Sequence, residues 1–153
     1  MANLTVTHTE DITLNGQQFG GTTIKSFSGI TEISKRILTI TTAECVIGTF
    51  SAAVASAGHY TAADVRYIRF TNLDGTNFVT LTFRNQDNDE FAVKLDAGQT
   101  LVLNGDNANG MTAIFNATQD ADAASSANFG SLTNIQADAD TGSCNLEVII
   151  ASV

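Results

Sequence analysis

Few side chains in this sequence could carry acid-base chemistry. Only two histidines, His8 and His59, could exchange protons near neutral pH. Neither lies beside residues that would orient it as a catalyst. The sequence also has no G-x-S-x-G turn, no H-E-x-x-H pair and no glycine-rich phosphate loop. We therefore expect no enzyme activity, no catalytic residue and no bound cofactor, and we interpret His59 as a solvated loop histidine.

Acidic residues form three short groups that could attract a cation. The groups are Asp87/Asp89/Glu90, Asp120/Asp122 and Asp138/Asp140. Calcium requires six to eight oxygen ligands at close range, and no group has the full EF-hand spacing. We expect turn carboxylates that bond to their own backbone and no metal site, with a bound cation as the alternative.

The two cysteines, Cys45 and Cys144, are about a hundred residues apart and lack metal-ligand spacing. A free cysteine usually behaves as a small buried hydrophobe. We expect this of both residues, with a disulfide between terminal strands as the alternative.

Length and charge limit the class of protein. The chain has 153 residues, which predicts one domain over residues 1–153. Charged residues make up 15% of it, against roughly 25% in ordinary domains, which indicates a surface that other protein covers. The formal net charge of −9 would repel a phosphate backbone, so we expect no nucleic-acid partner. The first residues lack the pattern of a signal peptide, and no apolar run reaches 18 residues. We therefore expect no membrane partner, and we expect the protein to stay in the cytoplasm or in a particle assembled there.

The clearest alternation of apolar and polar residues runs from Arg66 to Leu103. Three turn-like stretches divide it, namely Asp74-Gly75, the polar loop 85–89 and Asp96-Ala97-Gly98. Closing each as a hairpin predicts a four-stranded antiparallel meander over residues 66–103. The predicted pairs are Arg66/Phe83, Ile68/Leu81, Phe70/Val79, Phe83/Phe91, Leu81/Val93, Val79/Leu95, Arg84/Glu90, Leu101/Val93 and Leu103/Phe91.

One face of this meander is apolar and must be buried against a second layer. Together with the other short strands, this predicts an all-β fold, an antiparallel and jelly-roll-like β-sandwich. The opposite face carries Tyr67, Arg69, Arg84 and Lys94. We interpret that face either as solvated charge on protected edge strands or as a docking face for an acidic protein surface.

The rest of the chain predicts short strands and loops. We expect strands in 4–7, 12–14, 22–27, 30–42, 45–50, 111–117 and 146–151, turns at 8–11, 15–16 and 19–21, and a loop over 51–64. A change of apolar parity in 30–42 predicts a bulge or a bend near Arg36. The last strand is apolar on both faces, which is typical of a covered strand. Residues 118–133 predict a mobile arm or long surface loop, with a disordered loop or a short helix as alternatives.

Residues 64–74, 77–83 and 94–99 read as a strand, a polar turn, a second strand and a loop that contains Asp96-Ala97-Gly98. This pattern, over about a quarter of the chain, resembles small virion structural proteins of tailed bacteriophages, especially marine ones. The resemblance implies a β-sandwich that coats or joins the virion, either as a capsid decoration (cement) protein or as a component of the tail or an appendage.

We therefore expect a non-enzymatic virion protein that stabilises the shell by contact with the major capsid protein or other virion proteins and with copies of itself, as a homo-oligomer such as a trimer. A tail or appendage component is the first alternative. A carbohydrate-binding module that uses Tyr60 or Tyr67 is the second, and a small hydrolase is the last.

Overall fold

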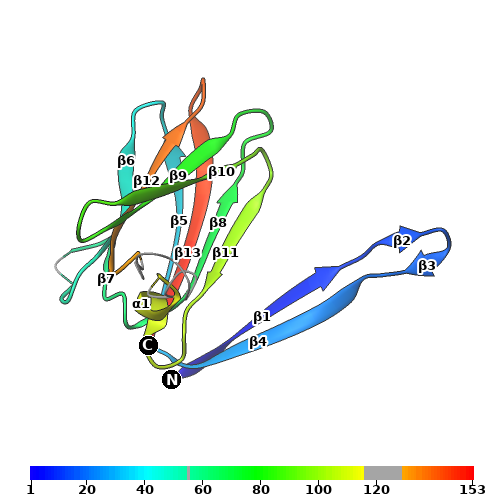
Figure 1. Ribbon diagram of the computed structural model, residues 1–153, viewed down its shortest axis with the longest axis horizontal. Coiled ribbons are helices and arrows are strands. Elements are labelled where there is room, and N and C mark those ends of the chain that lie inside the picture. Colours follow the sequence, from blue (N-terminus) through cyan, green and yellow to red (C-terminus); the bar gives the residue numbers. More distant parts are fainter. Residues whose placement is uncertain (55, 116–128) are drawn as a thin grey trace, which may run out of the picture.

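The computed structural model describes residues 1–54, 56–115 and 129–153. In these residues the chain forms a β-sandwich and a separate two-stranded ribbon that projects from one end of it (Figure 1). One sheet has the order β10-β9-β12-β6-β7, with β10 (Glu90–Leu95), β9 (Val79–Asn85), β12 (Leu132–Ala139), β6 (Cys45–Phe50) and β7 (His59–Tyr60). The other has the order β11-β8-β13-β5, with β11 (Thr100–Asn104), β8 (Val65–Asn72), β13 (Cys144–Ser152) and β5 (Glu32–Ile40). The predicted all-β antiparallel sandwich is confirmed.

The core lies between the two sheets because alternate residues of each strand point inward. Ile68 and Phe70 of β8 meet Val79, Leu81 and Phe83 of β9 in a single buried cluster. Burial of one such side chain contributes about 1.5–3 kcal/mol. The last strand, β13, is central in its sheet, between β8 and β5, as its two apolar faces predict.

The predicted meander is only partly correct. The hairpin of β9 and β10 is confirmed with its register, including the pairs Phe83/Phe91 and Arg84/Glu90. The other two hairpins are wrong, because β8 pairs with β11 and β13 in the opposite sheet. Inward-facing residues of two stacked sheets alternate in the same way as those of one sheet, so the sequence pattern fits both arrangements.

The side chain of Asn72 stabilises the segments through which the chain passes from one sheet to the other after β8 and after β10. The buried Asn72 side chain donates to the carbonyls of Asn77 (2.9 Å) and Leu95 (3.1 Å) and accepts from the N–H of Asp74 (3.0 Å). Asp74 in turn accepts from the backbone N–H of Asn77 and Thr76, which lowers the pKa of its carboxyl. The segment after β8 is therefore a capped loop that leads to the other sheet, instead of a tight turn.

The third predicted turn has the expected glycine but a different partner. Gly98 has a φ of 72°, the left-handed conformation that favours glycine. Its N–H donates to the carbonyl of Asn72, at the end of β8. The Asp96-Ala97-Gly98 turn therefore joins β10 of one sheet to β11 of the other.

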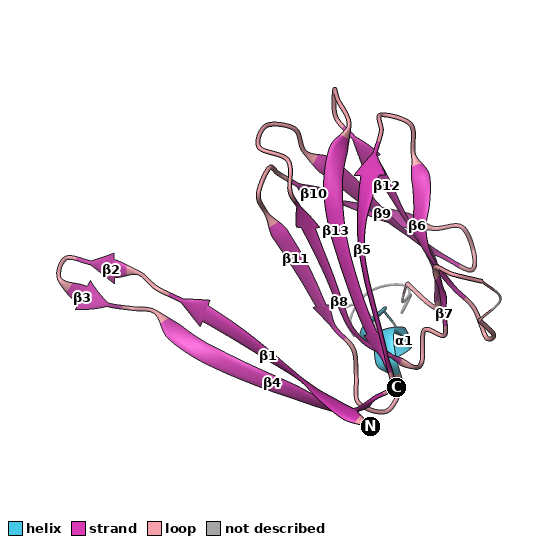
Figure 2. Cartoon of the chain, turned by 180° about the vertical axis from the view of Figure 1, so that it is seen from behind, coloured by secondary structure: helices cyan, strands magenta, loops and turns pink. Residues whose placement is uncertain are grey.

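The N-terminal residues form the ribbon, which we call the arm (residues 2–30). It consists of β1 (Ala2–Glu10), β4 (Gly21–Ile30) and a tip of β2 (Thr13–Leu14) and β3 (Gln17–Gln18) (Figures 1 and 2). The predicted turn at 8–11 is wrong, because β1 continues to Glu10 and pairs with Gly21. The turn at Asn15-Gly16 is confirmed by positive φ angles of 52° and 77°.

Two further predictions differ from the structure. The bulge near Arg36 is wrong, because β5 pairs with β13 without a register shift. The parity change arises because Ile33 and Ile37 face solvent while Ile40 faces the core. The strand at 111–117 is also wrong, because Gly110–Phe115 is a short helix, α1, in which Met111 is buried.

Two loop predictions complete the comparison. Residues 51–64 are mostly loop, as expected, with the short strand β7 beside β6. The arm or long loop expected at 118–133 lies largely outside the described residues, and β12 begins at Leu132.

Candidate functional site

The four residues of the predicted docking face lie on two opposite surfaces. Tyr67 and Arg69 belong to β8, whose inward neighbours Ile68 and Phe70 are in the core. Arg84 and Lys94 belong to β9 and β10 of the other sheet. Because the sheets pack with the core between them, these pairs point away from each other, so they do not form the single face that the meander predicted.

Tyr67 is not available to a partner. Its side chain is 7% exposed and packs with Phe27, Ile30 and Ala151 under the root of the arm. Burial raises the pKa of its hydroxyl, partly offset by the charge of Arg69. Tyr60 is also buried, and its hydroxyl lies 3.1 Å from that of Ser34. Neither tyrosine therefore offers an exposed ring to a sugar.

Arg69 belongs to a charged group on the outer face of the four-stranded sheet. The carboxylate of Glu147 on β13 lies between Arg69 on β8 and Lys35 on β5, with Lys35 Nζ 3.0 Å from Glu147 Oε2. The Lys35 hydrogen bond, then the charges of Lys35 and Arg69, lower the pKa of Glu147. We call Ile33, Lys35, Ile37, Arg69 and Glu147 the outer patch. It carries two cations and one anion, so it has an excess positive charge in an acidic chain.

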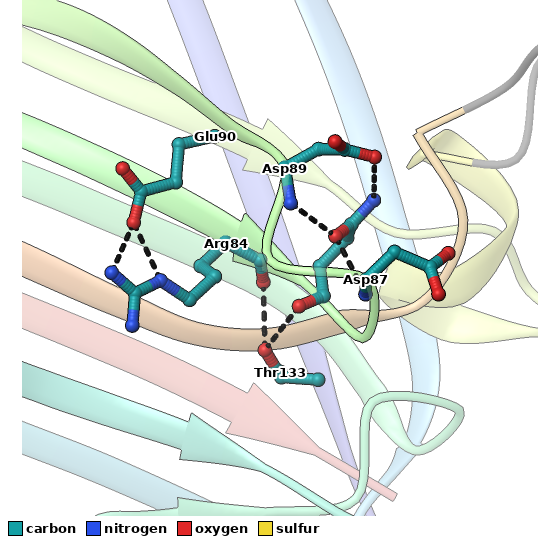
Figure 3. A network of polar contacts seen from close by, with 6 residues as sticks. Arg84, Asp87, Asp89, Glu90 and Thr133 are labelled. Carbon is teal, nitrogen blue, oxygen red and sulfur yellow. Dashed lines mark hydrogen bonds and ion pairs between the residues drawn. The ribbon is translucent and has the colours of Figure 1, made fainter.

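Arg84 belongs to a polar network at the β9-β10 loop (Figure 3). Its Nε donates to Glu90 over 2.5 Å, and the hydroxyl of Thr133 donates to the Arg84 carbonyl over 3.0 Å. The buried Asn85 side chain accepts from the N–H groups of Asp87 (2.9 Å) and Asp89 (2.8 Å). These bonds hold the loop that joins the two strands, so the network has a structural role.

Lys94 is also engaged within its own surface. Its ammonium lies 2.7 Å from a carboxylate oxygen of Asp96 and 4.5 Å from the centre of the Phe78 ring. A cation over an aromatic face gains about 0.5–1 kcal/mol at exposed sites.

The described residues offer limited means for binding a metal or a small molecule. Among them, no group of three or more His, Cys, Asp or Glu side chains is placed to hold a metal ion. His59 lines a hollow of about 280 Å³ with Glu32 and Arg36, a volume just below the range of typical ligand pockets. His8 lies 3.5 Å from Glu10, but both side chains are exposed on the arm.

The arm is the main functional candidate that the sequence patterns did not identify. It leaves four large apolar side chains in solvent, and each is more than half exposed: Ile12, Leu14, Phe19 and Ile24. A signal was present, because the turn at Asn15-Gly16 lies midway between two segments of similar length and alternation. The predicted turn at 8–11 broke the first of these segments and concealed the ribbon.

The root of the arm is fixed to the sandwich. Phe27 and Ile30 of β4 are buried against Tyr67 and Ala151, with Leu4 and Val6 packed beside them. Beyond this root, the ribbon diverges from the sheet and reaches away from it (Figure 2). At about 3.3 Å per residue, the extended chain from Ala2 to Asn15 spans roughly 40 Å.

Burial was expected for both cysteines, and the structure shows it for one of them. Both are free, but Cys45 is exposed, so the prediction that it is buried is wrong, whereas that for Cys144 is confirmed. Cys45 is the first residue of β6 and lies near Glu44 and Asp138. Burial of the thiol, then these two carboxylates, raise its pKa.

We therefore predict that a thiol reagent modifies one cysteine per native chain. The rate should rise about tenfold per pH unit near neutrality and continue to rise up to the raised pKa, because the thiolate is the reactive form. Mass spectrometry of the labelled protein measures this. The Cys45→Ser variant should label only after unfolding, and equal labelling of both native cysteines would contradict the assignment.

No protein-family model, curated protein or solved structure matches the chain. In the part of the chain that the structure describes, no helix has the length and apolar character needed to cross a membrane.

Proposed function

We propose that this protein is a non-enzymatic structural component of a virion, a capsid decoration (cement) protein that stabilises a phage shell through repeated protein-protein contacts. The observation that carries the proposal is the arm, which extends from the sandwich with apolar side chains exposed at its tip and along β4. An isolated two-stranded ribbon is only marginally stable in water. A second protein surface that covers it would supply the missing burial.

Charge and composition support the same role. The arm contains one lysine and two acidic residues of a chain with a net charge of −9, so eight of the nine excess negative charges belong to residues outside the arm. The sandwiches of neighbouring copies repel each other, whereas a nearly neutral arm can approach another protein. Contacts made by such arms, repeated by the symmetry of a shell, would raise the cost of shell expansion or rupture.

Binding to purified shells of the phage that encodes this chain tests the proposal. We expect saturable co-sedimentation with empty shells and a higher rupture temperature of the decorated shells. The double variant Ile12→Ser and Phe19→Ser should bind at least tenfold more weakly, because it removes the apolar tip.

A matched control is the substitution Val46→Ser, which removes a similarly exposed apolar side chain from β6 and should leave binding unchanged. Immunogold labelling of intact virions distinguishes the two virion locations. Gold on the capsid supports decoration, gold on the tail supports the appendage alternative, and absence of the protein from virions would refute both.

A further inference from the structure

The outer face of the four-stranded sheet is covered at one end only. Cross-strand pairing places its outward side chains in rows that run across β5, β13 and β8. The first row is Ile33, Ala151 and Tyr67, and the arm root buries the last two of these. The arm of the same chain therefore already acts as a second layer on this face.

The next two rows are covered much less, because only Ile149 of the second row packs against the cluster at the arm root. One contains Lys35, Ile149 and Arg69, and the other contains Ile37, Glu147 and Thr71. Ile33 and Ile37 are 59% and 60% exposed on β5. Apart from the contact at Ile149, the chain's own arm leaves these rows open, because it diverges from the sheet beyond its root (Figures 1 and 2).

The charges of this face and of the arm are complementary. The outer patch has two cations against one anion, and the hydrogen bond and charge of Lys35, with the charge of Arg69, lower the pKa of Glu147. The two acidic residues of the arm, Glu10 and Asp11, are adjacent and exposed, next to the apolar tip. The arm therefore presents carboxylates next to exposed apolar side chains. The outer patch presents cationic side chains next to exposed isoleucines, so the two surfaces are complementary in charge and both are partly apolar.

From this correspondence we propose that the arm of one copy lies across the outer patch of a second copy, with Glu10 and Asp11 near Lys35 and Arg69 of its neighbour. The contact continues the layer that each copy's own arm root begins. It is heterologous, since arm and patch are different surfaces, so successive copies form a closed ring or an open filament according to the rotation between them. The proposal deepens the virion role proposed above, because it identifies a second copy as the partner of the arm.

The test is a charge exchange measured by sedimentation velocity of the full chain. The unmodified protein should sediment as a multiple of the 16.1 kDa chain at tens of micromolar. Lys35→Glu and Glu10→Lys should each raise the dissociation constant about tenfold, because each places like charges together. The double variant should restore association to within about threefold of the unmodified protein, since it exchanges the two charges.

The matched control is Lys94→Glu, which makes the same change of charge at a lysine of similar exposure, 57% against 60%, on the opposite sheet. It should leave association unchanged, and thermal unfolding should show that every variant is folded. A second variant set, Ile12→Ser with Phe19→Ser, should also dissociate the oligomer.

Several outcomes would overturn the inference: a monomeric unmodified protein, an equal effect of Lys94→Glu, or a double variant that stays dissociated. A monomer that nevertheless saturates shells would overturn the inference and leave the proposed function intact. A charge-dependent oligomer that binds neither shells nor tails would support the inference and refute the virion role.

Discussion

Replacement of Phe83 by alanine is expected to lower the free energy of unfolding by about 4 kcal/mol. Phe83 is 1% exposed and lies at the centre of an aromatic cluster. Its ring is stacked on that of Phe91, with centroids 4.8 Å apart, and meets that of Phe70 edge-on at 6.3 Å. Phe115 of α1 packs against both Phe83 and Phe91. The alanine variant leaves a cavity that both sheets and the helix border.

Urea denaturation measures the loss, and Phe91→Ala is its control. Phe91 shares the ring stack but is 38% exposed, so its removal should cost less than half as much. Equal losses for the two variants would show that Phe83 is not the centre of the cluster.

The second large effect is expected for Asn72→Ala, at about 3 kcal/mol. The substitution leaves the carbonyls of Asn77 and Leu95 and the N–H of Asp74 without their side-chain partner. Groups of this kind cost about 1–3 kcal/mol each when buried and unpaired, although partial access of water reduces the total. Asn72 and Leu95 are buried, whereas Asp74 and Asn77 are half-buried, so the expected loss lies well below the sum of three fully buried groups.

The control for Asn72 is Asn145→Ala on β13. Asn145 is exposed, and its side-chain oxygen accepts a hydrogen bond from the hydroxyl of Thr39 at 3.3 Å. Its loss should change stability by at most about 0.5 kcal/mol. If chemical denaturation gave the same midpoint for both variants, Asn72 would not hold the crossing between the sheets.

The sequence predicts the fold class because alternation and turn residues are local properties. The β9-β10 hairpin is predicted with its register since its polar loop is short and Arg84/Glu90 supports the same alignment. The turns after β8 and β10 are misread because the decisive contact, between Asn72 and Leu95, joins residues in different sheets. Such long-range hydrogen bonds have no signature in the local pattern.

The candidate site was predicted less well than the fold. The predicted docking face, Tyr67, Arg69, Arg84 and Lys94, required all four strands to belong to one sheet. Because β8 and β9 lie in different sheets, these residues lie on two opposite surfaces. Only Arg69 remains in the proposed interface. The arm was missed because a break was assumed at 8–11, where His8 and Glu10 are polar strand residues exposed to solvent.

The position of β13 has a consequence for the synthesis of the chain. Cys144 pairs with Ile40 and Ser152 pairs with Glu32. The partner strand of β5, β13, is therefore synthesised more than a hundred residues after β5. During that delay β5 and β8 have edges open to wrong pairing, while the local hairpin of the arm can close within microseconds. Translation that pauses before β13 should therefore favour aggregation, and folding should be slow for a domain of this size.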